Sequence, residues 1–364
     1  MPVEALDAHS ALDRGEAARS ALVRSEIAEQ PAVVARLLGE QADAIGAVAA
    51  EVLRRRPRYV VIAARGTSDN AARYAQHLLG RLCGLPVALA TPSLHTLYRT
   101  PPSYRDALVL GISQSGASPD VVSVVDAARR QGSVTVALTN DADSPMAHAA
   151  AHTIDLCAGV EASVAATKTY TASLTAIAAL AAAIAQDDAA RRELDGLPSL
   201  LTAQLALAPD ADALAASEAV AWERLAVVGR GANYATAFEA ALKIKELTGI
   251  AAEPYSPADF LHGPIAVVRD GFPVLAVAAS GPALAGAAEL LEQVRARGGR
   301  ACLITDAPEL AAAGEPVLRA VPAPEWLSPL TCVLPAQLLA VATAERLGHD
   351  VDAPFGLSKV TRTT

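Results

Sequence analysis

The chain has 364 residues, of which 52% are hydrophobic and only 4% aromatic, and its formal net charge is −9. The length predicts about two domains with aliphatic cores. An acidic chain with no visible basic face argues against sequence-neutral binding of nucleic acid through its phosphates.

Residues 1–44 are predicted as an N-terminal helical segment. The opening letters, "MPVEALDAHSALDRGEAARS", are charged and lack the apolar core of a signal peptide. Four widely separated cysteines without metal-ligand spacing predict reduced thiols in a cytoplasmic protein, namely Cys83, Cys157, Cys302 and Cys332. The apolar run Leu174–Ala185 is too short for a membrane span and predicts a buried helix, so no membrane partner is expected.

Two halves of the chain repeat one pattern of apolar strand, glycine turn and amphipathic helix. "YVVIAARGTSDNAARYAQHLL" from Tyr59 matches "LAVVGRGANYATAFEAALKIKE" from Leu225, and "VLGISQSG" matches "VLAVAASG" at the same spacing. The strands are continuous aliphatic runs, which is typical of parallel sheets covered on both faces. The predicted fold class is α/β, with two tandem doubly wound, flavodoxin-like parallel-sheet domains. We expect them at residues 45–190 and 215–345, with a linker at 191–214 and an irregular C-terminal tail at 346–364.

Two turns of the first half are rich in small hydroxyl side chains. "GTSDN" follows one predicted strand and "SQSGAS" follows the next. Ligands of open parallel sheets bind where strands end and helices begin, and helix N-termini attract anions. Serine and threonine are also good N-caps, which is the alternative explanation. Two such turns side by side favour a phosphate monoester.

Other polar patterns allow more than one interpretation. "EAALKIKE" places Glu239, Lys243 and Glu246 at helical spacing, as in an ordinary surface salt-bridge ladder or in an acid–base site. "GRGANYA" lacks the third glycine of a dinucleotide site. "HAAAH" (His148 and His152) could bind a metal ion through two histidines one helical turn apart, but it lacks a third ligand. No metal and no cofactor are therefore expected.

Several segments together resemble the sugar isomerase domain family, in particular the isomerase half of glucosamine-6-phosphate synthase and the related stand-alone deaminases. They are "RGTSDNAARY", "SQSGASPD", "SVAATKTYTASL", "ALKIKELTGIAAEPYSPADFLHGPIAV", "VRARGG" and "LSKVTRT". The resemblance implies that Glu246 transfers a proton, with Lys243 one turn before it. It also implies that His262 opens the sugar ring from the partner subunit of a homodimer, and that Lys359 forms an imine or closes the site. The substrate-binding residues that it implies are Thr67, Ser68, Ser113, Gln114, Ser115, Ser118, Val164 and Ala166.

The sequence also departs from the synthase. Ala166 stands where the synthase carries a serine, and "APFGLSK" lacks an arginine–asparagine pair before the tail motif. No glutaminase region precedes the isomerase region, so we expect a deaminase that converts glucosamine 6-phosphate and water to fructose 6-phosphate and ammonia. The alternatives are a deaminase or isomerase of another phosphosugar, or a sensing module that binds a sugar phosphate without turnover.

Overall fold

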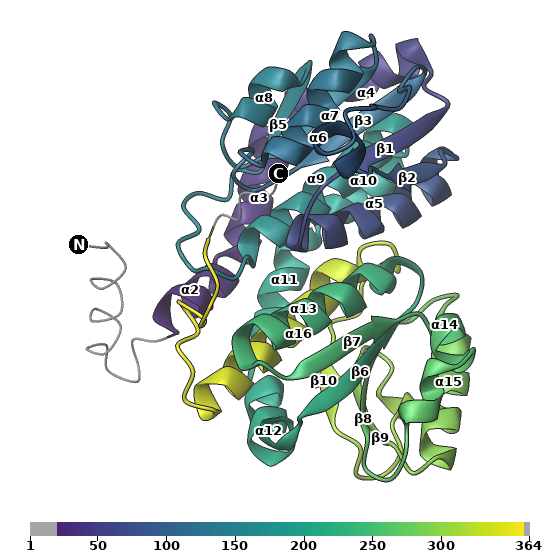
Figure 1. Cartoon of the computed structure of the whole chain (residues 1–364). Helices are drawn as coiled ribbons and strands as arrows, with labels where there is room; N and C mark the ends of the chain where they lie inside the picture. The colour runs from purple at the N-terminus through teal and green to yellow at the C-terminus, as the bar shows by residue number, and fades with distance from the viewer. Residues whose placement is uncertain (1–19, 360–364) are drawn as a thin grey trace, which may run out of the picture.

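The computed structural model describes residues 20–359, so the parts of the predicted N-terminal segment and tail at 1–19 and 360–364 lie outside the described residues. The described chain forms two α/β domains stacked one on the other (Figure 1). Each contains a parallel sheet of five strands with helices on both faces, which confirms the predicted fold class.

The first domain is built around β1–β5. Its sheet has the order β2-β1-β3-β4-β5, and every pairing is parallel. The strands are β1 (Tyr59–Ala63), β2 (Val87–Leu89), β3 (Ala107–Ile112), β4 (Val134–Thr139) and β5 (His152–Asp155). The helices are α3 (Gln30–Glu40), α4 (Ala42–Arg55), α5 (Thr67–Cys83), α6 (Ser93–Thr96), α7 (Pro119–Arg130), α8 (Pro145–Ala149) and α9 (Lys168–Ala185). The preceding helix, α2 (Ala21–Ala28), packs its buried apolar side chains into the core of the second domain.

The second domain repeats this topology in the order β10-β9-β8-β6-β7. Its strands are β6 (Arg224–Gly229), β7 (Ala251–Tyr255), β8 (Pro273–Ala278), β9 (Arg300–Thr305) and β10 (Val317–Arg319). Its helices are α13 (Tyr234–Thr248), α14 (Pro257–Leu261), α15 (Leu284–Ala296) and α16 (Ser328–Arg346). The segment predicted as a linker is helical and consists of α10 (Asp188–Asp195), α11 (Leu197–Leu205) and α12 (Pro209–Ser217).

Alternate residues of each central strand face different helices, because side chains point to opposite faces of a sheet. In β1, Val60 and Ile62 belong to a buried cluster with α4, α5 and α9, whereas Val61 and Ala63 pack with α7 and α8. Both faces are apolar, which is why the strands read as uninterrupted aliphatic runs.

Helix α9 is the apolar segment predicted to be buried, and it extends further than the apolar run Leu174–Ala185. It is the one helix within residues 20–359 that is long and apolar enough to cross a membrane by length and composition, and 89% of it is buried inside the structure. A buried core helix and a membrane span can share this composition. The packing of α9 in the first domain identifies it as a core helix.

The two domains share a continuous apolar interface. Three side chains at the start of α16 join the buried cluster of the first domain, namely Leu330, Val333 and Leu334. The Tyr74 hydroxyl on α5 donates to the Trp326 carbonyl oxygen at 2.8 Å. This interface brings α13 of the second domain against α5 of the first, which positions the site described next.

Candidate active site

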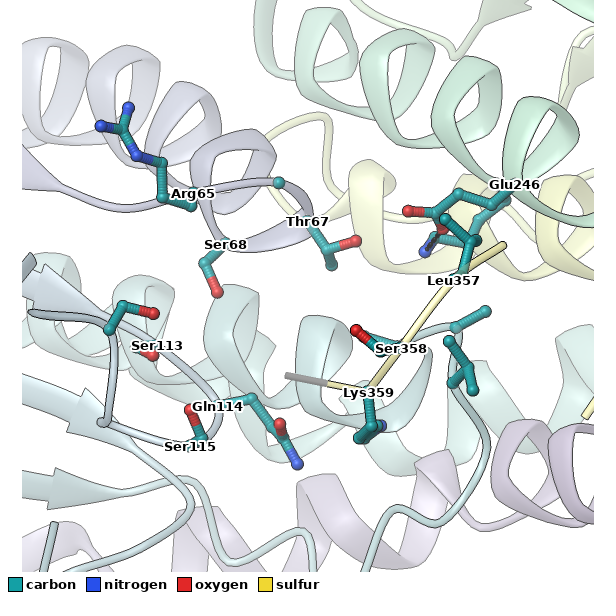
Figure 2. A pocket seen from close by; sticks show the side chains of 16 residues that line it. Arg65, Thr67, Ser68, Ser113, Gln114, Ser115, Glu246, Leu357, Ser358 and Lys359 are labelled. Carbon is teal, nitrogen blue, oxygen red and sulfur yellow. Dashed lines mark hydrogen bonds and ion pairs between the residues drawn. The ribbon is translucent and has the colours of Figure 1, made fainter. Parts of the chain in front are cut away.

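A cavity of about 430 Å³ opens at the carboxyl ends of β1 and β3, between the two domains. Its size lies within the range of about 300–1,000 Å³ that is usual for small-molecule sites. Figure 2 shows the hydroxyl-rich turns on one side, Glu246 on the other, and the C-terminal tail passing between them. All predicted site residues except His262 line it: Thr67, Ser68, Ser113, Gln114, Ser115, Ser118, Val164, Ala166, Lys243, Glu246 and Lys359.

The first hydroxyl-rich turn leads from β1 into α5. Gly66 precedes the helix with φ of +53°, in a region that favours glycine, and Thr67 and Ser68 form the first helical turn. The side chain of Thr67 is directed across the cavity toward Glu246 (Figure 2).

The second turn leads from β3 into α7 and depends on Gly116. This glycine has φ of +59°, and a Cβ atom there would lie 2.1 Å from the Ser144 Oγ. Only glycine can therefore hold the turn in this shape. The Ser113 Oγ accepts a hydrogen bond from the Gly116 amide at 3.1 Å, which fixes the turn internally.

Helix capping does not account for these hydroxyls. Gly66, and not a hydroxyl residue, occupies the N-cap position of α5. Ser118 occupies that of α7, but its side chain makes no capping hydrogen bond. Two helix N-termini thus open on the cavity with hydroxyls beside them, an arrangement that suits a phosphate group.

The acid–base pair lies on α13. Lys243 is almost fully buried, and its Nζ donates to a Glu246 carboxylate oxygen and lies 3.6 Å from the Glu239 Oε1. Burial would lower the pKa of Lys243, but the two facing carboxylates raise it above its ordinary value, so the ammonium stays charged. The Glu246 side chain remains 25% exposed at the cavity wall.

Glu239 is completely buried one turn before Lys243. Its Oε1 accepts from the Thr67 hydroxyl at 3.2 Å, and its Oε2 accepts from the Asn70 Nδ2 at 2.8 Å. Burial raises the pKa of this carboxyl to about 7, against the opposing effect of the Lys243 charge. The helical spacing of Glu239, Lys243 and Glu246 therefore belongs to an interior cluster, and the surface salt-bridge ladder is the wrong interpretation for Glu239.

A further wall of the cavity is formed by residues 161–167 and the C-terminal tail. Lys359 donates to the Glu161 Oε2 at 3.0 Å and to the Ser163 carbonyl oxygen at 2.6 Å. The Val164 amide donates to the Asp352 carbonyl oxygen at 3.2 Å. These contacts hold the tail against the loop that carries Val164 and Ala166.

The three histidines singled out in the sequence, of which only His262 was predicted as a site residue, lie away from the cavity. His262 follows α14 on the exposed surface of the second domain and does not line the cavity of its own chain, so its action across a dimer interface stays a prediction. His148 lies in α8 and His152 begins β5, so the two are not neighbours on one helical turn.

Five further lining residues lie in the quoted motifs but were not predicted individually as site residues: Arg65, Gly66, Ala165, Leu357 and Ser358. Arg65 had a signal, because an arginine directly precedes the glycine of the first turn. Its Nε donates to the buried Asp120 carboxylate at 2.7 Å, and Figure 2 shows its guanidinium directed away from Glu246.

The fold and the cavity define a two-domain α/β protein with a small-molecule site at its strand ends, and comparisons with known proteins agree. A family model described as the SIS domain matches residues 53–183 and 220–344. Glutamine–fructose-6-phosphate aminotransferase (isomerizing) of Zymomonas mobilis is 34% identical over 356 residues, covering 93% of this chain and 58% of that protein. The chain spans roughly half the length of the curated relatives it matches.

Two solved structures are similar over nearly their whole length. One is a Silicibacter pomeroyi protein assigned provisionally as a phosphosugar isomerase, with 39% identity, a TM-score of 0.82, and coverage of 90% of this chain and 98% of that one. The other is the C-terminal domain of glucosamine-fructose-6-phosphate aminotransferase from Francisella tularensis, with 29% identity, a TM-score of 0.82, and coverage of 90% and 97%. The chain belongs to the SIS domain family and groups with its phosphosugar-isomerising enzymes.

Proposed function

We propose that the protein is a glucosamine-6-phosphate deaminase, which converts glucosamine 6-phosphate and water to fructose 6-phosphate and ammonia. The observation that carries the proposal is the shared cavity, in which the hydroxyl-rich turns of the first domain face Glu246 and Lys243 of the second. The similarity to aminotransferases named for fructose 6-phosphate supports a phosphosugar of this size.

Substrate binding would use the two helix N-termini and their hydroxyls. The phosphate would accept from Ser68, Ser113 and Ser118, with Thr67, Gln114 and Ser115 completing the cradle. The sugar chain would then extend past Val164 and Ala166 toward Glu246. Lys243 and Lys359 supply positive charge close to the reacting end.

The chemistry would begin with ring opening by His262 of the partner subunit in a homodimer. Glu246 would take the proton from C2 of the open-chain aldehyde and return it at C1, which converts the aldehyde-amine to a ketose imine. Water then adds to C2, the C–N bond breaks, and ammonia leaves. The carbonyl next to C2 acidifies the migrating proton, so this route calls for no cofactor.

Incubation with glucosamine 6-phosphate tests the proposal, with fructose 6-phosphate and ammonia measured together. Glu246→Gln is expected to lower kcat by at least about a hundredfold, since general acid–base catalysis contributes roughly 10²–10⁴-fold. The affinity for a phosphate ester is expected to change little. Aldose–ketose conversion without ammonia would favour an isomerase of another phosphosugar, and binding without turnover would favour a sensing module.

A further inference from the structure

Glu239 connects the proposed phosphate turn to the proposed base, although it does not line the cavity. One of its oxygens, Oε1, accepts from the Thr67 hydroxyl at 3.2 Å and faces the Lys243 Nζ at 3.6 Å. The same Nζ donates to Glu246. A continuous chain of polar contacts therefore runs from Thr67 through Glu239 and Lys243 to Glu246.

The Thr67 hydroxyl has a single proton to donate. In the ligand-free arrangement that proton is directed to Glu239. A phosphate ester in the turn would accept the same proton, so Glu239 would lose one of its two neutral donors and keep only Asn70. The ester also adds about two negative charges nearby. Both changes favour protonation of a neighbouring carboxylate.

The groups around Glu239 decide where that proton goes. Helix α13 contributes Lys243 and Glu246, and α5 contributes the neutral side chains Thr67 and Asn70. Helix α9 contributes Tyr170, whose buried hydroxyl has no hydrogen-bond partner within residues 20–359. Glu161 acts on Lys243 from the loop before α9.

Of the two carboxylates on α13, Glu239 has the least to lose on protonation. It is completely buried, whereas the Glu246 side chain is 25% exposed and has the direct bond from Lys243. An isolated charge costs more in the interior than at a solvated wall.

We propose that Glu239 takes up a proton from solvent when a phosphate ester occupies the Thr67 turn, and that this proton uptake keeps Glu246 ionised. This inference rests on the proposed function. The proton adds to a Glu239 oxygen, and no other covalent bond changes. Lys243 then has Glu246 as its one charged partner on α13, so the base remains unprotonated although a dianion has entered the cavity. Glu239 is a positioning residue in this scheme, because it acts through Lys243.

Proton uptake on binding tests the inference without requiring turnover. Glucitol 6-phosphate, an open-chain ester that cannot react, is titrated calorimetrically at about pH 7.5, where the ester is largely dianionic. Two buffers of different ionisation enthalpy report the protons exchanged. Wild type is expected to take up between about a quarter and about three quarters of a proton per chain, because Glu239 with a pKa of about 7 already holds part of that proton at this pH. Glu239→Gln is expected to lose this uptake while its Kd stays within about threefold, because glutamine, like the carboxylate, accepts from Thr67 in the ligand-free protein.

Glu315→Gln is the matched control, since Glu315 pairs with Arg295 in the second domain outside this chain of contacts. It is expected to retain the uptake. Thr67→Val is expected to reduce the proton uptake, and Thr67→Ser is expected to restore it. These two variants test the inference if Glu239→Gln does not fold. Equal uptake in wild type and Glu239→Gln, or in wild type and Thr67→Val, overturns the inference alone. Binding by wild type without proton uptake does so as well. Failure of wild type to bind the ester contradicts the proposed function and the inference together.

Discussion

At the scale of single residues, the two carboxylates that face Lys243 on α13 differ mainly in their contact with water. Glu246 lies partly exposed at the wall and Glu239 is sealed between α5 and α13. The same side-chain chemistry therefore occurs in two environments, with one carboxylate open to the cavity and the other held in the interior. The spacing of these residues is visible in the sequence. The burial of Glu239 is not visible there, because it depends on α5 of the other domain.

The raised pKa of Glu239 predicts a specific pH dependence of stability. The carboxyl titrates near 4.5 when unfolded and at about 7 when folded. Between these values the folded state holds a proton that the unfolded state has lost, so this residue makes stability fall as pH rises across the window. Glu239→Gln is expected to flatten this part of the profile, measured by urea unfolding at several pH values. Parallel profiles for wild type and variant would show that Glu239 does not titrate there.

At the scale of elements, three segments far apart in the sequence form one wall of the site. Asp352 in the tail accepts from the Val23 amide of α2 at 2.9 Å, and Glu26 of α2 accepts from the Ser163 amide at 3.2 Å. The tail runs back past α2 toward the first domain (Figure 1). The family motif predicted that Lys359 lies at the site. It did not reveal that α2 and the loop 161–167 hold it there, because those contacts join residues more than a hundred positions apart.

Glu161 is predicted to dock the tail. Its completely buried side chain accepts from the Thr167 and Thr169 amides, the Thr169 hydroxyl and the Lys359 ammonium. Glutamine would place an NH₂ group against the ammonium, so Glu161→Gln should release Lys359. The chain has four lysines, which makes amine acetylation followed by peptide mass spectrometry a direct measurement. We expect Lys359 to react several-fold faster in the variant, relative to the exposed Lys245.

Glu29→Gln is the control for this experiment. It breaks the ion pair with Lys168, which begins α9 next to the same loop, without touching the tail. The Lys359 rate should then match wild type. An unchanged Lys359 rate in Glu161→Gln would mean that the tail is held by other contacts.

At the scale of the whole molecule, the sequence predicted each domain better than their arrangement. Continuous aliphatic strands and glycine turns repeated along the chain were enough to predict two doubly wound sheets, because these patterns are local. The packing of α13 against α5, which completes the cavity, is backed by α9, which packs on α5 in the core of the first domain, and by α16, which joins the buried clusters of both domains. Such alanine-rich helices have little amphipathic pattern to indicate their neighbours.

The proposed homodimer, in which His262 of one chain completes the site of the other, makes a prediction about mixed subunits. His262→Ala and Glu246→Gln should each be inactive, because each lacks one group of every site. Hybrid dimers formed by unfolding and refolding the two variants together would combine the intact Glu246 of one chain with the intact His262 of the other. Random pairing in a two-fold dimer should restore about a quarter of the wild-type activity. A mixture that stays inactive would indicate that His262 does not act across an interface.

In the proposed function, one cavity holds a phosphate ester at the turns of the first domain and presents its carbon chain to Glu246 of the second. A crystal structure with glucitol 6-phosphate tests this most directly. We expect the phosphate to accept from Ser68, Ser113 and Ser118, and C1 and C2 to face the Glu246 carboxylate. A phosphate bound elsewhere, with both turns empty, would contradict the account.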